Sequence, residues 1–447
     1  MANIKNHPTV LKYRELEAQG GLIAREAPLD ADWLKNLCLE AGADDVGVID
    51  INNPAVADQR DKILEAYPKT KAIISIIARM NRTPVQSTLR TIANTEFHTV
   101  GHEIDQISHT IVRQLEDLGI GALNPAMAFP MEMGNFPDSN TFILSHKPIA
   151  EAAGLGVMGI HRNVIHPKYG NFILLGSILL GEEVSAYDSR LDYNPCFECK
   201  LCVAVCPVGA IAADGHFNAT ACLNHNYREF FGGFVEWAET LAETKNKDDY
   251  RKEVTVSEDA TRWQSFTGGA NYNTAYCMAV CPAGDDVIGP FLQDKKRFLE
   301  ETVKPFQKKE ETLFITQNSD AMAYAAKKYP HKKIQVVDGG IVPQSVKGFL
   351  WGTPISFQRN QSEGLNATYH FKFTGEEATE QTFIIKDKTL TIEEGLIGTA
   401  DIEIEIDGHD WINLLNNRLN PIWAVVSRKL KIKGDRELLF RFQKCFG

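Results

Sequence analysis

The feature that most constrains this chain is a run of four cysteines followed at once by proline, in the stretch NPCFECKLCVAVCPVGA. Its spacing is C-x2-C-x2-C-x3-C-P. Three closely spaced thiolates can curl around one cuboidal iron–sulfur cluster, and the fourth, ahead of proline, is usually directed to a second cluster. A zinc site more often has two C-x2-C pairs separated by a longer loop. The run therefore predicts iron–sulfur ligands at Cys196, Cys199, Cys202 and Cys206.

A second, stretched half of the same pattern lies further along the chain. Cys277 and Cys281 repeat the C-x3-C-P ending, and Cys222 stands upstream across a long insertion. The ligand exchange of two-cluster ferredoxins then assigns each cysteine to a cluster. The first cluster is expected on Cys196, Cys199, Cys202 and Cys281, and the second on Cys206, Cys222 and Cys277.

This assignment leaves the second cluster one cysteine short. The position three residues before Cys277, where a further cysteine is expected, is Thr274. The second cluster is therefore either [3Fe–4S], or [4Fe–4S] with a non-cysteine or distant ligand, for which His225 is a candidate. The first is expected to be [4Fe–4S]. Cys38 and Cys445 are expected to be ordinary thiols.

Length and composition set the general class. The 447 residues suggest about two to four domains. A net charge of −11 gives no general attraction to phosphate, so no nucleic-acid partner is expected. The N-terminal residues resemble no leader, the apolar stretches are too short to span a bilayer, and the ligand-type cysteine spacing fits a reducing compartment. We expect a cytoplasmic protein without a membrane span.

Hydrophobic periodicity predicts the fold class. Helical spacing over 31–45 and 95–118 alternates with short β-branched runs at 45–49 and 71–78, which indicates an α/β or α+β core. From Leu365 onward strict alternation predicts a sheet with one buried face. The expectation is an α+β multidomain chain with domains at 1–185, 186–306 and 307–447, the last being a linker and a sheet domain.

Gly154, Gly156 and Gly159 formally match a G-x-G-x-x-G motif. The motif follows a predicted helix rather than a strand, and no acidic residue stands at the required distance beyond it. A dinucleotide site needs both features. The glycines are therefore interpreted as a turn, or as a place where backbone passes close to something bulky.

The stretch SHKPIAEAAGLGVMGIHRNVIHPKYGNFILLGSILLG, with the cluster run and ACLNHNYRE, resembles the corrinoid-dependent iron–sulfur reductases, which comprise reductive dehalogenases and epoxyqueuosine reductases. The resemblance implies a nitroreductase-like domain over a non-covalent cobalamin and a two-cluster ferredoxin-like domain that delivers electrons to cobalt. By position, the residues that would line the corrinoid are Gly154, Gly156, Gly159, His161, Asn163, His166, Gly170, Asn224 and His225.

Two activities compete within that family. Epoxyqueuosine reductases carry an acid where this chain has Ser145, and a tRNA-binding helical tail that is not recognised here. We therefore expect a reductive dehalogenase-like oxidoreductase that reduces a small hydrophobic substrate, supplied with electrons by a ferredoxin, flavodoxin or reductase. The alternatives are a tRNA-modifying epoxyqueuosine reductase and a non-catalytic electron-transfer or lipid-binding protein. The candidate proton donors are His98, His146, Lys147 and Arg162.

The last segment, about Leu365–Phe446, resembles the sterol carrier protein 2 (SCP2) domain through LNATYHFKFTG, TADIEIEIDGHDWINLLNNRLNPIWAVVSRKLKIKGD and FRFQKCF. In that family a sheet and helices enclose an apolar tunnel for lipids. The sequence leaves two roles open for the apolar face: it either encloses cargo or packs against the reductase.

Overall fold

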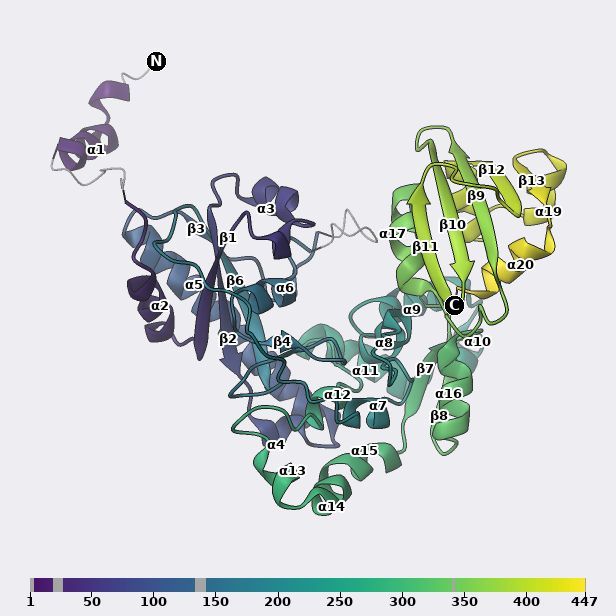
Figure 1. Cartoon of the computed structure of the whole chain (residues 1–447), viewed down its shortest axis with the longest axis horizontal. Helices are drawn as coiled ribbons and strands as arrows, with labels where there is room; N and C mark the ends of the chain where they lie inside the picture. The colour runs from purple at the N-terminus through teal and green to yellow at the C-terminus, as the bar shows by residue number, and fades with distance from the viewer. Residues whose placement is uncertain (1–3, 19–26, 133–141, 340–341, 447) are drawn as a thin grey trace.

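The computed structural model describes residues 4–18, 27–132, 142–339 and 342–446. Helix α1 (Pro8–Ala18) has no buried residue and stands off from the body. An N-terminal sheet with helices, a mainly helical part that carries the clustered cysteines, and a C-terminal sheet follow along the chain (Figure 1). The expectation of an α+β multidomain protein is confirmed.

The N-terminal sheet is antiparallel, in the order β1-β2-β6-β3. Along β2, alternate isoleucines face opposite sides: Ile74 and Ile76 pack toward α5 and α2, and Ile73 and Ile77 toward α3 and α6. Both faces are therefore covered, which explains the continuous apolar runs. The strands are β1 (Asp45–Asp50), β2 (Ala72–Arg79), β3 (Ala122–Leu123) and β6 (Ile173–Leu180), and the helices α2 (Ala31–Glu40), α3 (Arg60–Ala66), α4 (Arg82–Val85), α5 (Arg90–Asp117) and α6 (His146–Ala152).

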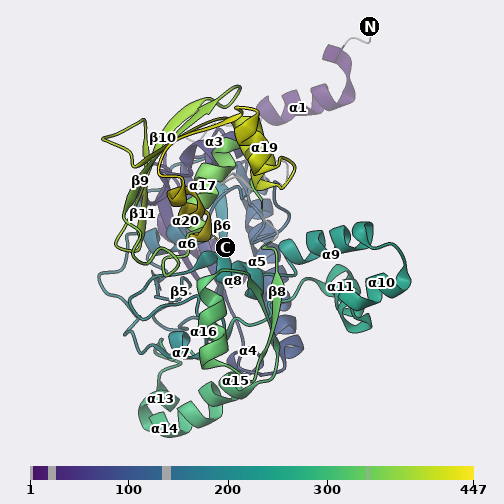
Figure 2. The same cartoon turned by 90° about the vertical axis from the view of Figure 1, so that its right-hand side faces the viewer.

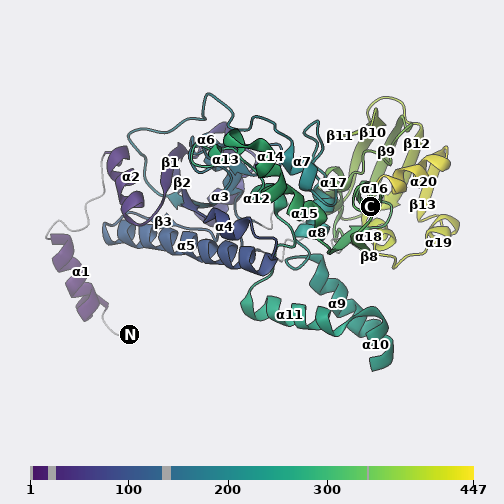
Figure 3. The same cartoon turned by 90° about the horizontal axis from the view of Figure 1, so that it is seen from below.

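The cysteine-bearing part consists mainly of short helices. Its central elements are the hairpin β4 (Val157–Met158) and β5 (Val164–Ile165), with helices α7 (Leu201–Val205), α8 (Ala219–Asn226) and α12 (Tyr276–Ala279). Helices α13 (Gly289–Gln293), α14 (Lys295–Phe298) and α15 (Lys304–Lys308) follow. The insertion between Cys222 and Cys277 forms α9 (Gly232–Glu243), α10 (Lys247–Glu253) and α11 (Val256–Gly268), which project from the body (Figures 2 and 3).

Hydrogen bonds close the base of this insertion. The side-chain oxygen Oδ1 of Asn226 accepts from the backbone N–H groups of Thr274 (3.0 Å) and Ala275 (2.8 Å) and from the Thr274 hydroxyl (3.0 Å). The Asn273 amide donates to the carbonyl of His225 at 2.8 Å. The two ends of the insertion are therefore held together whatever lies between them.

Residues expected to form a linker instead build part of the wall around the cysteines. Strands β7 (Thr312–Thr316) and β8 (Lys333–Val337) pair in parallel, with α16 (Asp320–Lys328) between them in the chain. Leu313 and Ile315 belong to the same apolar cluster as Cys202 and Cys206. This β-α-β unit thus packs with the metal-ligand candidates.

The C-terminal sheet has the order β11-β10-β9-β12-β13, with β9 and β12 parallel. One face carries aromatic rings, in which Phe371 contacts Phe349 of α17, Trp411 of α18 and Phe442 of α20. The predicted alternation is confirmed. The strands are β9 (Ala367–Thr374), β10 (Thr379–Lys386), β11 (Thr389–Glu394), β12 (Ile402–Asp407) and β13 (Leu430–Gly434), and the helices α17 (Val346–Ser356), α18 (Gly408–Leu415), α19 (Pro421–Val426) and α20 (Glu437–Lys444).

The C-terminal part is joined to the cysteine-bearing part by polar contacts. The Asn218 amide donates to Gln358 at 2.9 Å, and the Thr220 hydroxyl donates to the carbonyl of Ile355 at 3.1 Å. Among the helices that the structure describes, we find none with the length and apolar character needed to cross a membrane.

Candidate metal centre

The first cysteine group, Cys196, Cys199, Cys202 and Cys281, lines one pocket beside the β4–β5 hairpin. Glu198 and Lys200, which alternate with the cysteines, have left-handed backbone (φ 51° and 60°). Such conformations are costly for residues with a Cβ, and here they coil the run tightly. The structure therefore brings Cys281 to three cysteines that lie far from it in sequence.

The second cysteine group, Cys206, Cys222 and Cys277, shares an apolar cluster with Val208 and Ile211. Cys206 is buried, and the other two are half-buried. Burial raises the pKa of Cys277 to about 12, and the negative charge of Cys206 adds to this effect. Burial likewise raises the pKa of Cys222, with added repulsion from Cys277 and Cys206. Thiolates here need positive charge or a metal beside them.

Both groups offer thiols, whose thiolates are the usual ligands of iron–sulfur clusters. Among the described residues, no three His, Cys, Asp or Glu side chains converge as ligands of one ion. Thiolates of a cuboidal cluster bind different irons, so their sulfurs lie farther apart than the ligands of one ion. The donor sets therefore fit the expected clusters, with three cysteines at the second group.

The position of the missing cysteine is occupied by a buried residue with its own partner. Thr274 is bound to Asn226 through both its backbone N–H and its hydroxyl. His225 is also buried, which lowers its pKa to about 4. Its Nδ1 accepts from the backbone N–H of Phe314 (3.3 Å), and its Nε2 has no hydrogen-bond partner among the described residues.

Among the expected proton donors, Lys147 interacts electrostatically with two of the cysteines, Cys222 and Cys277. Its Nζ donates to the carbonyl of Arg162 at 2.7 Å and contacts Oδ1 of Asn163 at 3.4 Å, which joins α6 to the tip of the β4–β5 hairpin. Burial lowers the pKa of Lys147, and the charges of Cys222 and Cys277 oppose that effect. Arg162 itself is exposed and donates to the carbonyl of Gly215.

The two candidate histidines lie in separate places. The ring of His146 is held by Ser177 Oγ at 2.9 Å and the carbonyl of Ala126 at 3.3 Å, and burial lowers its pKa to about 4, so the ring is neutral at neutral pH. His98 is on α5, where its ring abuts Gly269 after α11. The contacts of these rings join neither of them to Lys147.

The glycines expected to cradle a corrinoid pack against the protein itself. A Cβ on Gly156 would meet the carbonyl oxygen of Ile165 at 2.5 Å, and one on Gly170 would meet that of Ala283 at 2.0 Å. Gly154 lies against the carbonyl oxygen of Ser189, and Gly159 against Ile165 and the His161 ring. These glycines allow close approach of chain segments, which the turn interpretation expected. The lining of a corrinoid by these residues stays a prediction.

The other residues named for the corrinoid divide between separate locations. His161 lines the pocket of the first cysteine group, where its Nδ1 accepts from the backbone N–H of Asn163. His166 instead contacts Asp45 on β1 at 2.9 Å. Asn224 lines another pocket, with Arg228, Gly232 and Gly339, and its Nδ2 is buried without a described partner.

Two polar residues beside these groups carry no motif and were not expected. Asn171 is buried, and its amide lies 3.2 Å from Nε2 of His161. Arg90, the first residue of α5, faces Tyr276, the residue before Cys277. Spacing along the chain gives no signal for either residue, because partners far away in sequence create both environments.

Sequence comparison finds relatives that match less than half of the chain. Epoxyqueuosine reductase of Staphylococcus aureus is 29% identical over 189 residues, 40% of this chain and 41% of the relative. Epoxyqueuosine reductase of Escherichia coli is 27% identical over 175 residues, 38% of this chain and 44% of the relative. The chain thus covers less than half of each of these two relatives.

Solved structures give weaker likenesses. That of epoxyqueuosine reductase from Streptococcus thermophilus has 18% identity and a TM-score of 0.34, covering 61% of this chain and 74% of that one. A reductive dehalogenase structure described as suggesting a mechanism for B12-dependent dehalogenation has 18% identity and a TM-score of 0.33, covering 40% of this chain and 25% of that one.

The C-terminal part matches a family model, the SCP-2 sterol transfer family, over residues 356–447. The resemblance expected for this segment is confirmed. The chain thus combines a part with sequence similarity to epoxyqueuosine reductases and a C-terminal domain of the SCP-2 sterol transfer family.

Proposed function

We propose that this protein is an iron–sulfur oxidoreductase in which two clusters pass single electrons from an external carrier to a substrate. The observation that carries the proposal is the gathering of seven cysteines in space. Cys281 lies beside Cys196, Cys199 and Cys202, and Cys277 lies beside Cys206 and Cys222, while Cys202 also belongs to the apolar cluster of the second group. The similarity to enzymes named reductases supports a redox role.

The first cysteine group is the proposed entry point for electrons. Phe197, Glu198 and Lys200 also line its pocket, and Phe197 and Glu198 are exposed. The second group packs with Val208, Ile211 and residues of β7. We propose that a ferredoxin or flavodoxin approaches the first group from solvent and that electrons then pass to the second group.

The comparisons favour epoxide reduction over dehalogenation as the chemistry of the substrate, because the sequence relatives are named epoxyqueuosine reductases. Reduction of an epoxide to an alkene consumes two electrons and two protons and releases water. Two one-electron deliveries through the clusters supply the electrons. A modified tRNA is therefore a specific candidate substrate, contrary to the expectation of no nucleic-acid partner.

One residue separates this chain from the chemistry expected of that family. Ser145 stands where the family resemblance places an acid, at the start of α6, and its backbone N–H donates to Gln59 at 2.6 Å. Its side chain has no carboxyl proton to donate. Lys147, two residues on, is the charged group that we propose to supply protons beside the second cysteine group.

The cluster proposal is tested on the full chain, purified and reconstituted without oxygen. We expect about seven to eight irons per chain, matching one four-iron and one three- or four-iron cluster. Cys202→Ser and Cys222→Ser should each remove one electron paramagnetic resonance (EPR) signal, and Cys38→Ala should remove none. A wild-type chain that binds less than about one iron contradicts the proposal.

The substrate is tested separately, with reduced clusters and chemical dithionite as donor. Conversion of epoxyqueuosine in tRNA supports the tRNA-modifying function. Consumption of a halogenated aromatic compound with halide release, and none of the tRNA, would restore the dehalogenase hypothesis. Absorption bands of bound cob(II)alamin after reconstitution would show that the chain takes a corrinoid despite its packed glycines.

A further inference from the structure

The hydrogen-bond donors of the Arg90 side chain are only partly satisfied by the described residues. Its Nη1 donates to the carbonyl of Ser87 at 3.1 Å, with that of Val85 at 3.5 Å. Its Nε and Nη2 are buried and have no partner among the described residues. A buried donor left unpaired costs about 1–3 kcal/mol, and more when it is charged. The site therefore calls for an acceptor that the described side chains do not supply.

The guanidinium lies within electrostatic reach of the second cysteine group. It lies over the ring of Tyr276, 5.4 Å from the ring centre, and Tyr276 directly precedes Cys277. Burial lowers the pKa of Arg90, and the negative charges of Tyr276, Glu311 and Cys277 oppose that effect. Of the groups whose charge acts on Arg90, Cys277 belongs to the second cysteine group, so we look for the missing acceptor at that group.

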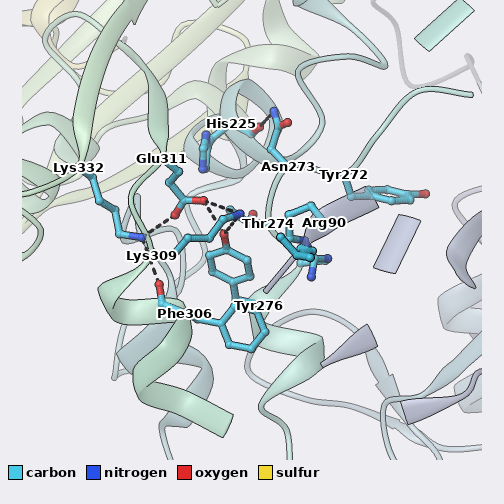
Figure 4. Close-up of polar contacts among 12 residues, drawn as sticks. Arg90, His225, Tyr272, Asn273, Thr274, Tyr276, Phe306, Lys309, Glu311 and Lys332 are labelled. Carbon is cyan, nitrogen blue, oxygen red and sulfur yellow. Dashed lines mark hydrogen bonds and ion pairs between the residues drawn. The ribbon is translucent and has the colours of Figure 1, made fainter. Parts of the chain in front are cut away.

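On the far side of Tyr276 from Arg90, one carboxylate is shared by two lysines (Figure 4). The Tyr276 hydroxyl donates to Glu311 at 2.5 Å, Lys332 Nζ binds the same carboxylate at 2.6 Å, and Lys309 Nζ lies 3.4 Å from it. The single negative charge of Glu311 is therefore shared between two lysines. The network around Tyr276 therefore carries an excess of positive charge toward Cys277.

We propose that Arg90 is the hydrogen-bond donor and counter-charge of the second cluster and raises its reduction potential. This inference rests on the proposed function, since it needs a cluster on Cys206, Cys222 and Cys277. The sulfurs of an iron–sulfur cluster accept hydrogen bonds, and such bonds and nearby charge set the potential. Thr274, in the place of a cysteine, also raises the reduction potential of the second cluster, because the site then has one negative charge fewer.

The consequence is a direction for electron flow. Electrons enter at the first cysteine group, which opens to solvent, and are drawn to the second group, where Arg90 and Lys147 favour the reduced state. Arg90 thus favours electron flow toward the second cluster, and it does not need to contact the substrate.

Three full-length variants test this, in redox titrations followed by EPR. Arg90→Gln removes the charge, and Arg90→Lys keeps the charge but loses the paired donors. Arg251→Gln is the control, since Arg251 lies in the insertion, pairs with Asp259 at 2.6 Å and stacks over Tyr250. Cys222→Ser identifies which signal belongs to the second cluster.

We expect Arg90→Gln to lower the equilibrium constant for reduction of the second cluster at least tenfold, which is about 59 mV for one electron. Arg90→Lys should give a smaller shift, and Arg251→Gln none. An unchanged second potential in Arg90→Gln, or equal shifts of both clusters, overturns the inference. If Arg90→Gln no longer binds the second cluster, the inference is tested with Arg90→Lys instead. An unchanged second potential in that variant, or equal shifts of both clusters, overturns the inference. A wild-type chain without clusters refutes the proposed function instead.

Discussion

Lys332 and Glu311 form an ion pair of 2.6 Å in the interior, with 1% and 11% of their side chains exposed. Lys332 also donates to the carbonyl of Phe306 at 3.2 Å. Because Glu311 in turn holds Tyr276, the pair links β8 to the segment that carries Cys277.

Removing one partner of this pair should be costly. Lys332→Met removes the shorter of the two lysine contacts of Glu311 and leaves Lys309 at 3.4 Å, so we expect a loss of about 2 kcal/mol in the free energy of unfolding. Lys304→Met is the control, because Lys304 forms an exposed pair with Glu300 and should cost less than about 0.5 kcal/mol. Urea unfolding of both variants measures the difference, and equal midpoints would contradict the role of the interior pair.

His146 predicts a pH dependence of stability. Its pKa in the fold is about 4, below the ordinary value of 6.5, so the unfolded chain takes up its proton first as pH falls. Stability from this residue is therefore present above about pH 6.5 and is lost as pH falls toward 4. Between pH 7 and 5 the loss should be at most about 2 kcal/mol. The slope of unfolding free energy against pH should be smaller in His146→Gln, and an unchanged slope would refute this.

Phe371 should dominate the stability of the C-terminal domain. It contacts Phe349, Trp411 and Phe442, and Phe371→Ala should cost about 3–5 kcal/mol. Phe440 on α20 is 67% exposed, so Phe440→Ala should change little. The thermal transition of this domain in the full chain separates the two, and similar shifts would mean that the aromatic cluster is not the core.

The grouping of the cysteines predicts that substitutions within one group abolish the same EPR signal, even where the two residues lie far apart in sequence. Cys281→Ser should abolish the same EPR signal as Cys196→Ser, and Cys277→Ser the same signal as Cys222→Ser. Cys445→Ser, at a buried thiol outside both groups, should abolish neither. If Cys281→Ser instead removed the signal of Cys277→Ser, the assignment of ligands to groups would be wrong.

Local periodicity predicted much of the fold. The run of residues 71–78 forms β2, and the alternation from Leu365 forms β9, because each strand shows its burial directly in its side-chain pattern. The long helix predicted from 95 begins earlier, at Arg90. The segment expected as a linker forms β7 and β8, whose parallel pairing requires a crossover that no short window of sequence reveals.

The candidate site was only partly visible in the sequence. Cysteine spacing carries a direct signal, since thiolate ligands must recur at short intervals. The environments of Lys147 and Arg90 depend on segments that meet only after folding, such as α6 with the β4–β5 hairpin and α5 with α12. The glycines from Gly154 to Gly170 show the same limit, since their neighbours at Ser189 and Ala283 are distant in the chain.

The hydrogen bonds at the base of the insertion, made by Asn226, Asn273, Thr274 and Ala275, affect how the length of the insertion can change in evolution. The entropy of closing a loop rises only with the logarithm of its length, about 0.6 kcal/mol for each doubling. Helices α9, α10 and α11 could therefore be shortened, lengthened or exchanged while Cys222 and Cys277 keep their places. The cysteine run has no such freedom, because adding one residue there would turn a thiol away from its group.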